Sequence, residues 1–71
     1  MKMYTILDTI SEIIKRADEA KNNLKNNGHD EREYGRLYAL CEILSIIKID
    51  FVGETEVENI LNFDIDKKYL L

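Results

Sequence analysis

The chain has 71 residues, a formal net charge of −4 and a hydrophobic share of 45%, with no proline and three glycines. This length allows one domain with a small core, and the composition argues against a disordered chain. One cysteine and one histidine exclude a disulfide framework and a four-ligand zinc cage, so the core lacks the usual supports of a small domain.

The first part of the chain predicts an amphipathic helix over residues 4–26. Glu12 and Arg16 are four positions apart, which predicts a favourable charge pair. Apolar residues recur at spacings of three and four and so share one face. They are Met3, Ile6, Ile10, Ile13, Ala17, Ala20 and Leu24, with Leu7 and Ile14 beside them.

The start of the chain has no long apolar run and no cleavage site of small residues. We therefore expect neither a secretion signal nor a membrane span. The unpaired thiol of Cys41 and the missing export signal together predict a cytoplasmic location.

The segment NNGH predicts the end of the first helix, because Gly28 can take the left-handed conformation that closes a helix. Asp30 and Glu33 then have the spacing of a capping box and predict a second helix over residues 30–49. Two helices of similar length with a short connection predict an antiparallel hairpin.

The second helix is apolar on more sides than the first helix can cover. One stripe contains Tyr34, Leu37, Tyr38, Cys41 and Leu44, whereas Leu40, Ile43, Ile46 and Ile47 lie on other sides. We expect these other sides to be covered by the end of the chain, within the subunit or across a dimer. Leu40, Ile43, Ile46 and Ile47 are thus the candidate self-association residues, and a dimer of hairpins would form a four-helix bundle.

The last third predicts a short helix over residues 55–62, since Thr55 and Glu58 have the spacing of a capping box. Residues 63–71 contain Phe63, Ile65, Tyr69, Leu70 and Leu71, which predict a C-terminal clasp that packs on the hairpin. The sequence therefore predicts a single all-α domain over residues 1–71.

Catalytic groups are sparse. His29 lies in the predicted loop, and Cys41 lies on an apolar stripe, where it resembles a small core residue. Asp64 and Asp66 form an Asp-x-Asp pair but lack the glycine and terminal glutamate of a calcium loop. We predict no catalytic residue, no cofactor and no metal site, and therefore a protein that is not an enzyme.

Charge is distributed unevenly along the chain. Residues 1–49 carry eight basic and eight acidic side chains, while residues 50–66 carry six acidic and no basic ones. An acidic block with apolar anchors predicts contact with a basic protein surface, although acidic residues also serve solubility. The candidate partner-binding residues are Glu54, Glu56, Glu58, Asp64 and Asp66.

A second hypothesis is an oligomer that sequesters a nucleotide-like ligand. Arg32 and Arg36 are one helical turn apart and could grip a phosphate, with Tyr34 and Tyr38 in pockets between subunits. The same residues also fit a solvated face in which Glu33 pairs with Arg36. A DNA-binding regulator is a third hypothesis, which the net charge and the missing basic stripe disfavour.

The segments EYGRLYALCEILSIIK and NFDIDKKYL resemble a pattern in short helical proteins of Gram-positive phages and mobile elements. The resemblance covers residues 34–71 and carries over no functional residue. It implies a small intracellular protein that contacts a host protein, such as one involved in defence. The leading hypothesis is therefore a non-enzymatic protein-interaction module.

Overall fold

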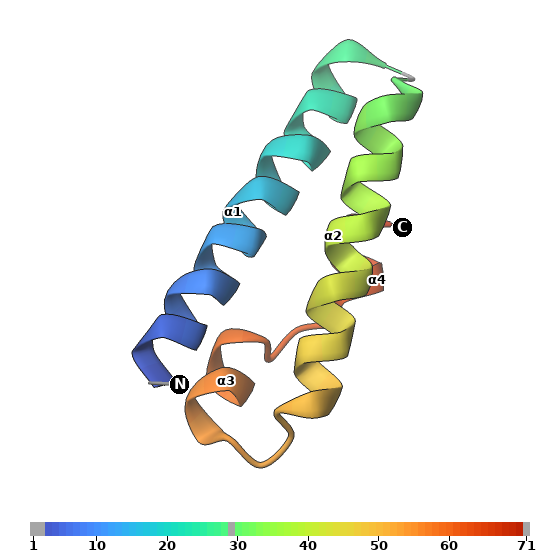
Figure 1. Cartoon of the computed structure of the whole chain (residues 1–71). Helices are drawn as coiled ribbons and strands as arrows, with labels where there is room; N and C mark the ends of the chain where they lie inside the picture. The colour runs from blue at the N-terminus through green and yellow to red at the C-terminus, as the bar shows by residue number, and fades with distance from the viewer. Residues whose placement is uncertain (1–2, 29, 71) are drawn as a thin grey trace.

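The computed structural model describes residues 3–28 and 30–70, which form four helices and no strand (Figure 1). The helices are α1 (Met3–Asn27), α2 (Glu31–Asp50), α3 (Thr55–Ile60) and α4 (Ile65–Tyr69). Figure 1 shows α1 and α2 as an antiparallel hairpin, with α3 at its open end and α4 beside α2. The predicted all-α hairpin with a short C-terminal helix and clasp is confirmed.

The core lies between the two long helices and is closed by α3 and α4. The predicted stripe of α1 faces inward: Ile10, Ala17 and Ala20 are fully buried. The side chain of Met3 lies outside the described part of the chain. The complete buried cluster consists of Ile10, Ala17, Ala20, Leu37, Cys41, Leu44, Val57, Leu61, Ile65 and Tyr69.

The start of α2 has the predicted N-cap but lacks the predicted capping box. Asp30 is the N-cap, and its carboxylate accepts a hydrogen bond from the Arg32 backbone N–H at 3.0 Å. The predicted return bond from Glu33 is absent, because the Glu33 carboxylate accepts instead from Asn23 at 3.3 Å and from Arg36 at 3.5 Å. The N-cap is therefore confirmed, whereas the capping box is wrong.

The predicted capping box of α3 is also wrong. Gly53 takes a φ of +95°, and this turn puts Glu54 in extended conformation immediately before the helix. Glu54 is thus the N-cap and makes no side-chain capping bond, while Thr55 is already helical. At the other turn, Gly28 has a φ of +76°, which confirms its predicted left-handed conformation.

The C-terminal segment docks on its own subunit. Asp64 caps α4 by accepting a hydrogen bond from the Lys67 backbone N–H at 3.1 Å. Ile65 and Tyr69 of α4 are buried, at 5% and 2% exposure. The clasp therefore closes within the subunit.

Two lysines fasten this segment to the hairpin through backbone carbonyls. Lys48 of α2 donates to the Phe63 carbonyl at 2.7 Å, and Lys21 of α1 donates to the Tyr69 carbonyl at 2.9 Å. Since the donors belong to different helices, α4 is held over the seam between α1 and α2.

The clasp does not cover the outer side of α2, contrary to the expectation from the sequence. Ile43 and Ile46, which lie on this side, are 44% and 53% exposed. Leu40 and Ile47 are instead partly buried against the core of their own subunit. The outer side stays open because the contacts to α1 hold α4 on the opposite side of α2.

No helix in the described part of the chain is long and apolar enough to cross a membrane.

Candidate functional site

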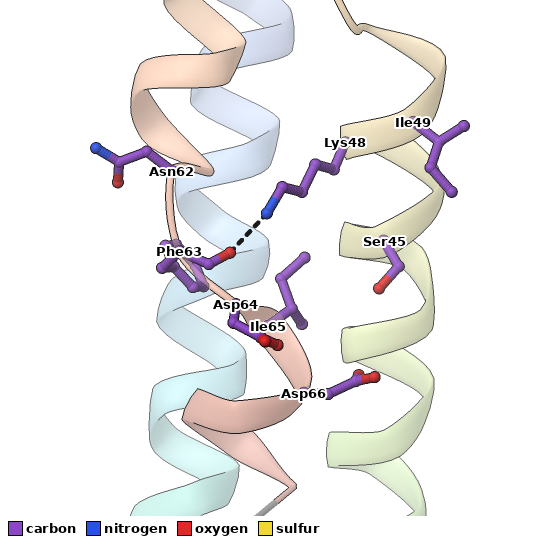
Figure 2. Close-up of a pocket in the computed structure, with 8 residues that line it drawn as sticks. All are labelled: Ser45, Lys48, Ile49, Asn62, Phe63, Asp64, Ile65 and Asp66. Atoms are coloured by element: carbon purple, nitrogen blue, oxygen red, sulfur yellow. Dashed lines mark hydrogen bonds between the residues drawn. The ribbon is translucent and has the colours of Figure 1, made fainter.

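An open hollow of about 410 Å³ lies between α2 and the segment that leads into α4 (Figure 2). Its residues come from two stretches far apart in the sequence, Ser45, Lys48 and Ile49 on α2 and residues 62–66 opposite. Figure 2 shows Lys48 reaching across the hollow to the Phe63 carbonyl oxygen. The hollow therefore exists because the C-terminal segment docks beside α2.

Two smaller hollows continue this one along α2. One, of about 220 Å³, shares Lys48 and Asn62 with it and extends to Val52 and Glu58. The other, of about 200 Å³, shares Ser45 and Asp66 with it and is further lined by Tyr38, Cys41, Glu42 and Leu70. Together they form a groove that runs from Val52 to Tyr38, roughly 20 Å at 1.5 Å per helical residue.

The groove is predominantly acidic. Four exposed carboxylates line it: Glu42 on α2, Glu58 on α3, and Asp64 and Asp66 at the start of α4. Among the described lining residues, Lys48 is the only cation, and its ammonium group is already bonded to a carbonyl. The groove therefore presents a net negative charge.

Apolar side chains alternate with these carboxylates. Ile49 and Val52 are more than 70% exposed, at 72% and 73%, and Tyr38 is more than half exposed. Phe63 and Leu70 are partly buried and pack against the core beneath the groove. The groove thus offers both exposed apolar area and negative charge over its length.

The structure brings together part of the predicted acidic set. Glu58, Asp64 and Asp66 line the groove, whereas Glu54, the N-cap of α3, and Glu56 on α3 are exposed outside its three hollows. Glu42 was missed by the sequence analysis. Glu42 lies outside the acidic block of residues 50–66, and no local pattern singles it out, because it joins the groove only through the side of α2 on which α4 docks.

Within one subunit, the proposed ligand-binding residues do not converge. Tyr34 and Tyr38 are 53% and 55% exposed. Arg32 and Arg36 are each two positions from a tyrosine and so point to a different side of the helix. Arg36 pairs with Glu33 at 3.5 Å, as the solvated-face interpretation predicts. A ligand pocket between subunits stays a prediction.

The single cysteine is a core residue. Cys41 is 1% exposed, and its pKa is raised by burial and by the nearby Asp66 carboxylate, an effect that Lys21 partly offsets. The thiol therefore stays protonated near neutral pH, which disfavours nucleophilic attack. No group of three or more potential metal ligands occurs among the described residues, and His29 lies outside them.

No protein-family model, curated protein or solved structure matches the chain. The resemblance to phage and mobile-element proteins and the absence of enzymatic activity both stay predictions.

Proposed function

We propose that this protein is a non-enzymatic interaction module that binds a basic, partly apolar segment of another protein in the groove along α2. One observation carries the proposal: exposed apolar side chains and four carboxylates line the same open groove. Acidic residues placed for solubility alone would not need to gather beside Ile49 and Val52.

The chemistry of the groove favours lysine and arginine side chains. Their aliphatic stems can pack on Ile49, Val52 and Tyr38, while their charged ends reach the carboxylates of Glu58 and Asp66. A cationic segment also approaches faster, because opposite charges steer the encounter. A small molecule binds best in an enclosed pocket, whereas the three hollows of this groove are open to solvent.

We further propose a host protein as the partner and the cytoplasm as the location. The resemblance of residues 34–71 to phage and mobile-element proteins supports a host partner. The buried, unpaired thiol of Cys41 supports a reducing compartment. The acidic lining counts against DNA, since phosphates would meet carboxylates.

The test uses a synthetic helical peptide of leucine and lysine, with leucine at spacings of three and four, titrated calorimetrically at low salt. The double variant Glu58→Gln, Asp66→Asn should weaken binding by about tenfold, because it removes two groove carboxylates at nearly constant shape. The matched control, Asp8→Asn with Glu19→Gln, removes the same charge from exposed positions of α1. Equal weakening in both double variants would show that only net charge matters and would refute the groove.

A further inference from the structure

The outer side of α2 is unusual because it combines exposed isoleucines with exposed small residues. Gly35, Ala39, Ile43 and Ile46 follow one another at spacings of four, four and three, so they lie along one side of the helix. All four are exposed. The buried residues of α2, Leu37, Cys41 and Leu44, lie on the opposite side and face α1 and α4.

Side chains on this outer face are small in its N-terminal half and large in its C-terminal half. The N-terminal half carries the small residues Gly35 and Ala39, and the C-terminal half carries the large Ile43 and Ile46. A side-chain carbon built on Gly35 would meet nothing within 4 Å, so the space above it is open to another molecule. An identical helix in the opposite direction would bring its large residues to these small ones.

The two ends of this face also carry opposite charges. Arg32 and Asp50 are both exposed and lie nine positions on either side of Cys41. Eighteen residues are five helical turns, so both lie on the same side of α2 as the apolar stripe. Ala39 and Ile43 lie two positions on either side of Cys41. A two-fold axis that crosses the outer face at the level of Cys41 would therefore place Arg32 opposite Asp50 and Ala39 opposite Ile43 of the second copy.

We propose that α2 pairs with α2 of a second copy in antiparallel orientation. The two-fold axis crosses the outer face at the level of Cys41 along the helix. Gly35 and Ala39 of each copy receive Ile46 and Ile43 of the other, and Arg32 of each lies opposite Asp50 of the other. A two-fold interface requires one surface to complement itself, and this face does so in both size and charge. A parallel pair would instead place isoleucine on isoleucine and arginine on arginine.

The stripe residues of this interface do not line the groove, although Glu42 of the groove lies at the edge between the two surfaces. The groove lies on the side of α2 that carries Tyr38 and Ser45, and the stripe lies on the outer side. The two Glu42 carboxylates flank the axis at the solvent-exposed edge, where salt screens their repulsion. A single pair of helices buries less than the roughly 800 Å² per partner of stable complexes, so we expect a weak dimer.

Sedimentation equilibrium of the full chain from about 10 µM to about 1 mM tests the proposal. We expect the mass to rise from that of the 8.3 kDa monomer toward twice this value. Ile46→Glu should weaken the dimer by more than about tenfold while circular dichroism shows unchanged helicity, because Ile46 is exposed in the subunit. Val52→Glu is the control, since Val52 is also apolar and, at 73%, even more exposed than Ile46, but lies off the stripe.

A charge exchange tests the orientation. Arg32→Glu and Asp50→Arg should each weaken the dimer, and the double variant should restore it to within about threefold, because the exchanged charges again face each other. Each substitution favours the helix dipole, so weakening cannot result from loss of α2. A monomeric mass at about 1 mM, equal weakening by Val52→Glu, or a double variant weaker than both single ones would refute the proposal. At monomer concentrations Ile46→Glu should bind the leucine–lysine peptide at least as tightly as the parent chain, because Ile46 lies outside the groove and the added charge is negative. Loss of the dimer is thereby distinguished from loss of the groove.

Discussion

The Tyr69 hydroxyl donates a hydrogen bond of 2.6 Å to the Asp18 carboxylate and thereby joins the last helix to the middle of the first. The Tyr69 ring is 2% exposed and packs edge-on against Phe63, with ring centroids 6.3 Å apart. The Tyr69 carbonyl also accepts from Lys21 of α1. A single residue near the end of the chain therefore fixes the position of α4, and with it one wall of the groove.

Tyr69→Phe should lower the free energy of unfolding by about 1 kcal/mol, because it removes the bond to Asp18 and keeps the packed ring. Tyr69→Ala should cost about 3–5 kcal/mol, since it also leaves a cavity. Urea denaturation followed by circular dichroism measures both. Tyr38→Phe is the control. An equal loss of unfolding free energy in Tyr38→Phe and Tyr69→Phe would show that the hydrogen bond to Asp18 does not stabilise the fold.

Stability should fall at alkaline pH because two buried groups resist deprotonation. Burial, followed by the bond to Asp18, raises the pKa of Tyr69 above its ordinary 10.0. Burial, followed by Asp66, raises the pKa of Cys41 above its ordinary 9.0. Once the pH exceeds these ordinary values, the unfolded chain releases protons that the folded chain retains, so unfolding becomes easier.

Urea midpoints measured from about pH 7 to about pH 10.5 should therefore be level up to pH 9 and then decline. Cys41→Ala removes one titrating group and should reduce the decline between about pH 9 and pH 10. An identical pH profile for this variant and the parent chain would contradict the assignment to the thiol.

The three glycines should respond differently to alanine. Gly35 lies inside α2 with open space around it, so Gly35→Ala should stabilise the protein by about 0.5–1 kcal/mol. Gly28 and Gly53 have φ values of +76° and +95°, so alanine there should destabilise it by about 1 kcal/mol. Thermal denaturation at low protein concentration separates these effects from self-association. A loss at Gly35 would show that this position makes a contact in the monomer.

The helices were predictable because their signals are local. The predicted ranges 4–26 and 30–49 differ by only one residue at each end from α1 and α2. Periodicity places residues on a face, and Asp30 marks a start. The N-cap of α3 was misassigned by one residue, to Thr55 instead of Glu54, because the conformation of Gly53 decides it and a glycine's φ cannot be read from spacing.

The side of α2 that α4 covers could not be predicted. Both the Cys41 side and the Ile46 side are apolar, so either could have accepted the clasp on hydrophobic grounds. The choice is made by α1, which holds α4 through Asp18 and Lys21. The groove could not be predicted for the same reason, because Glu42 and Asp66 become neighbours only when α4 packs on the Cys41 side of α2.

The two sides of α2 should differ in their tolerance to truncation. Leu44 is fully buried, and Leu44→Ala should cost about 2–5 kcal/mol of unfolding free energy. Ile49 is 72% exposed, and Ile49→Ala should change stability by less than about 0.5 kcal/mol. Urea denaturation at low protein concentration compares them directly. A large loss for Ile49→Ala would mean that the monomer covers this side in solution.

Lys48 should affect stability and binding in opposite directions. Its ammonium group donates to the Phe63 carbonyl at 2.7 Å, so Lys48→Met should lower the free energy of unfolding by about 0.5–1.5 kcal/mol. The same substitution removes the only cation among the described groove residues and adds apolar area. Binding of the leucine–lysine peptide should therefore tighten by a few-fold at low salt, and the gain should shrink as salt rises. Lys15→Met on the exposed side of α1 changes net charge equally, and an equal gain there would assign the effect to net charge alone.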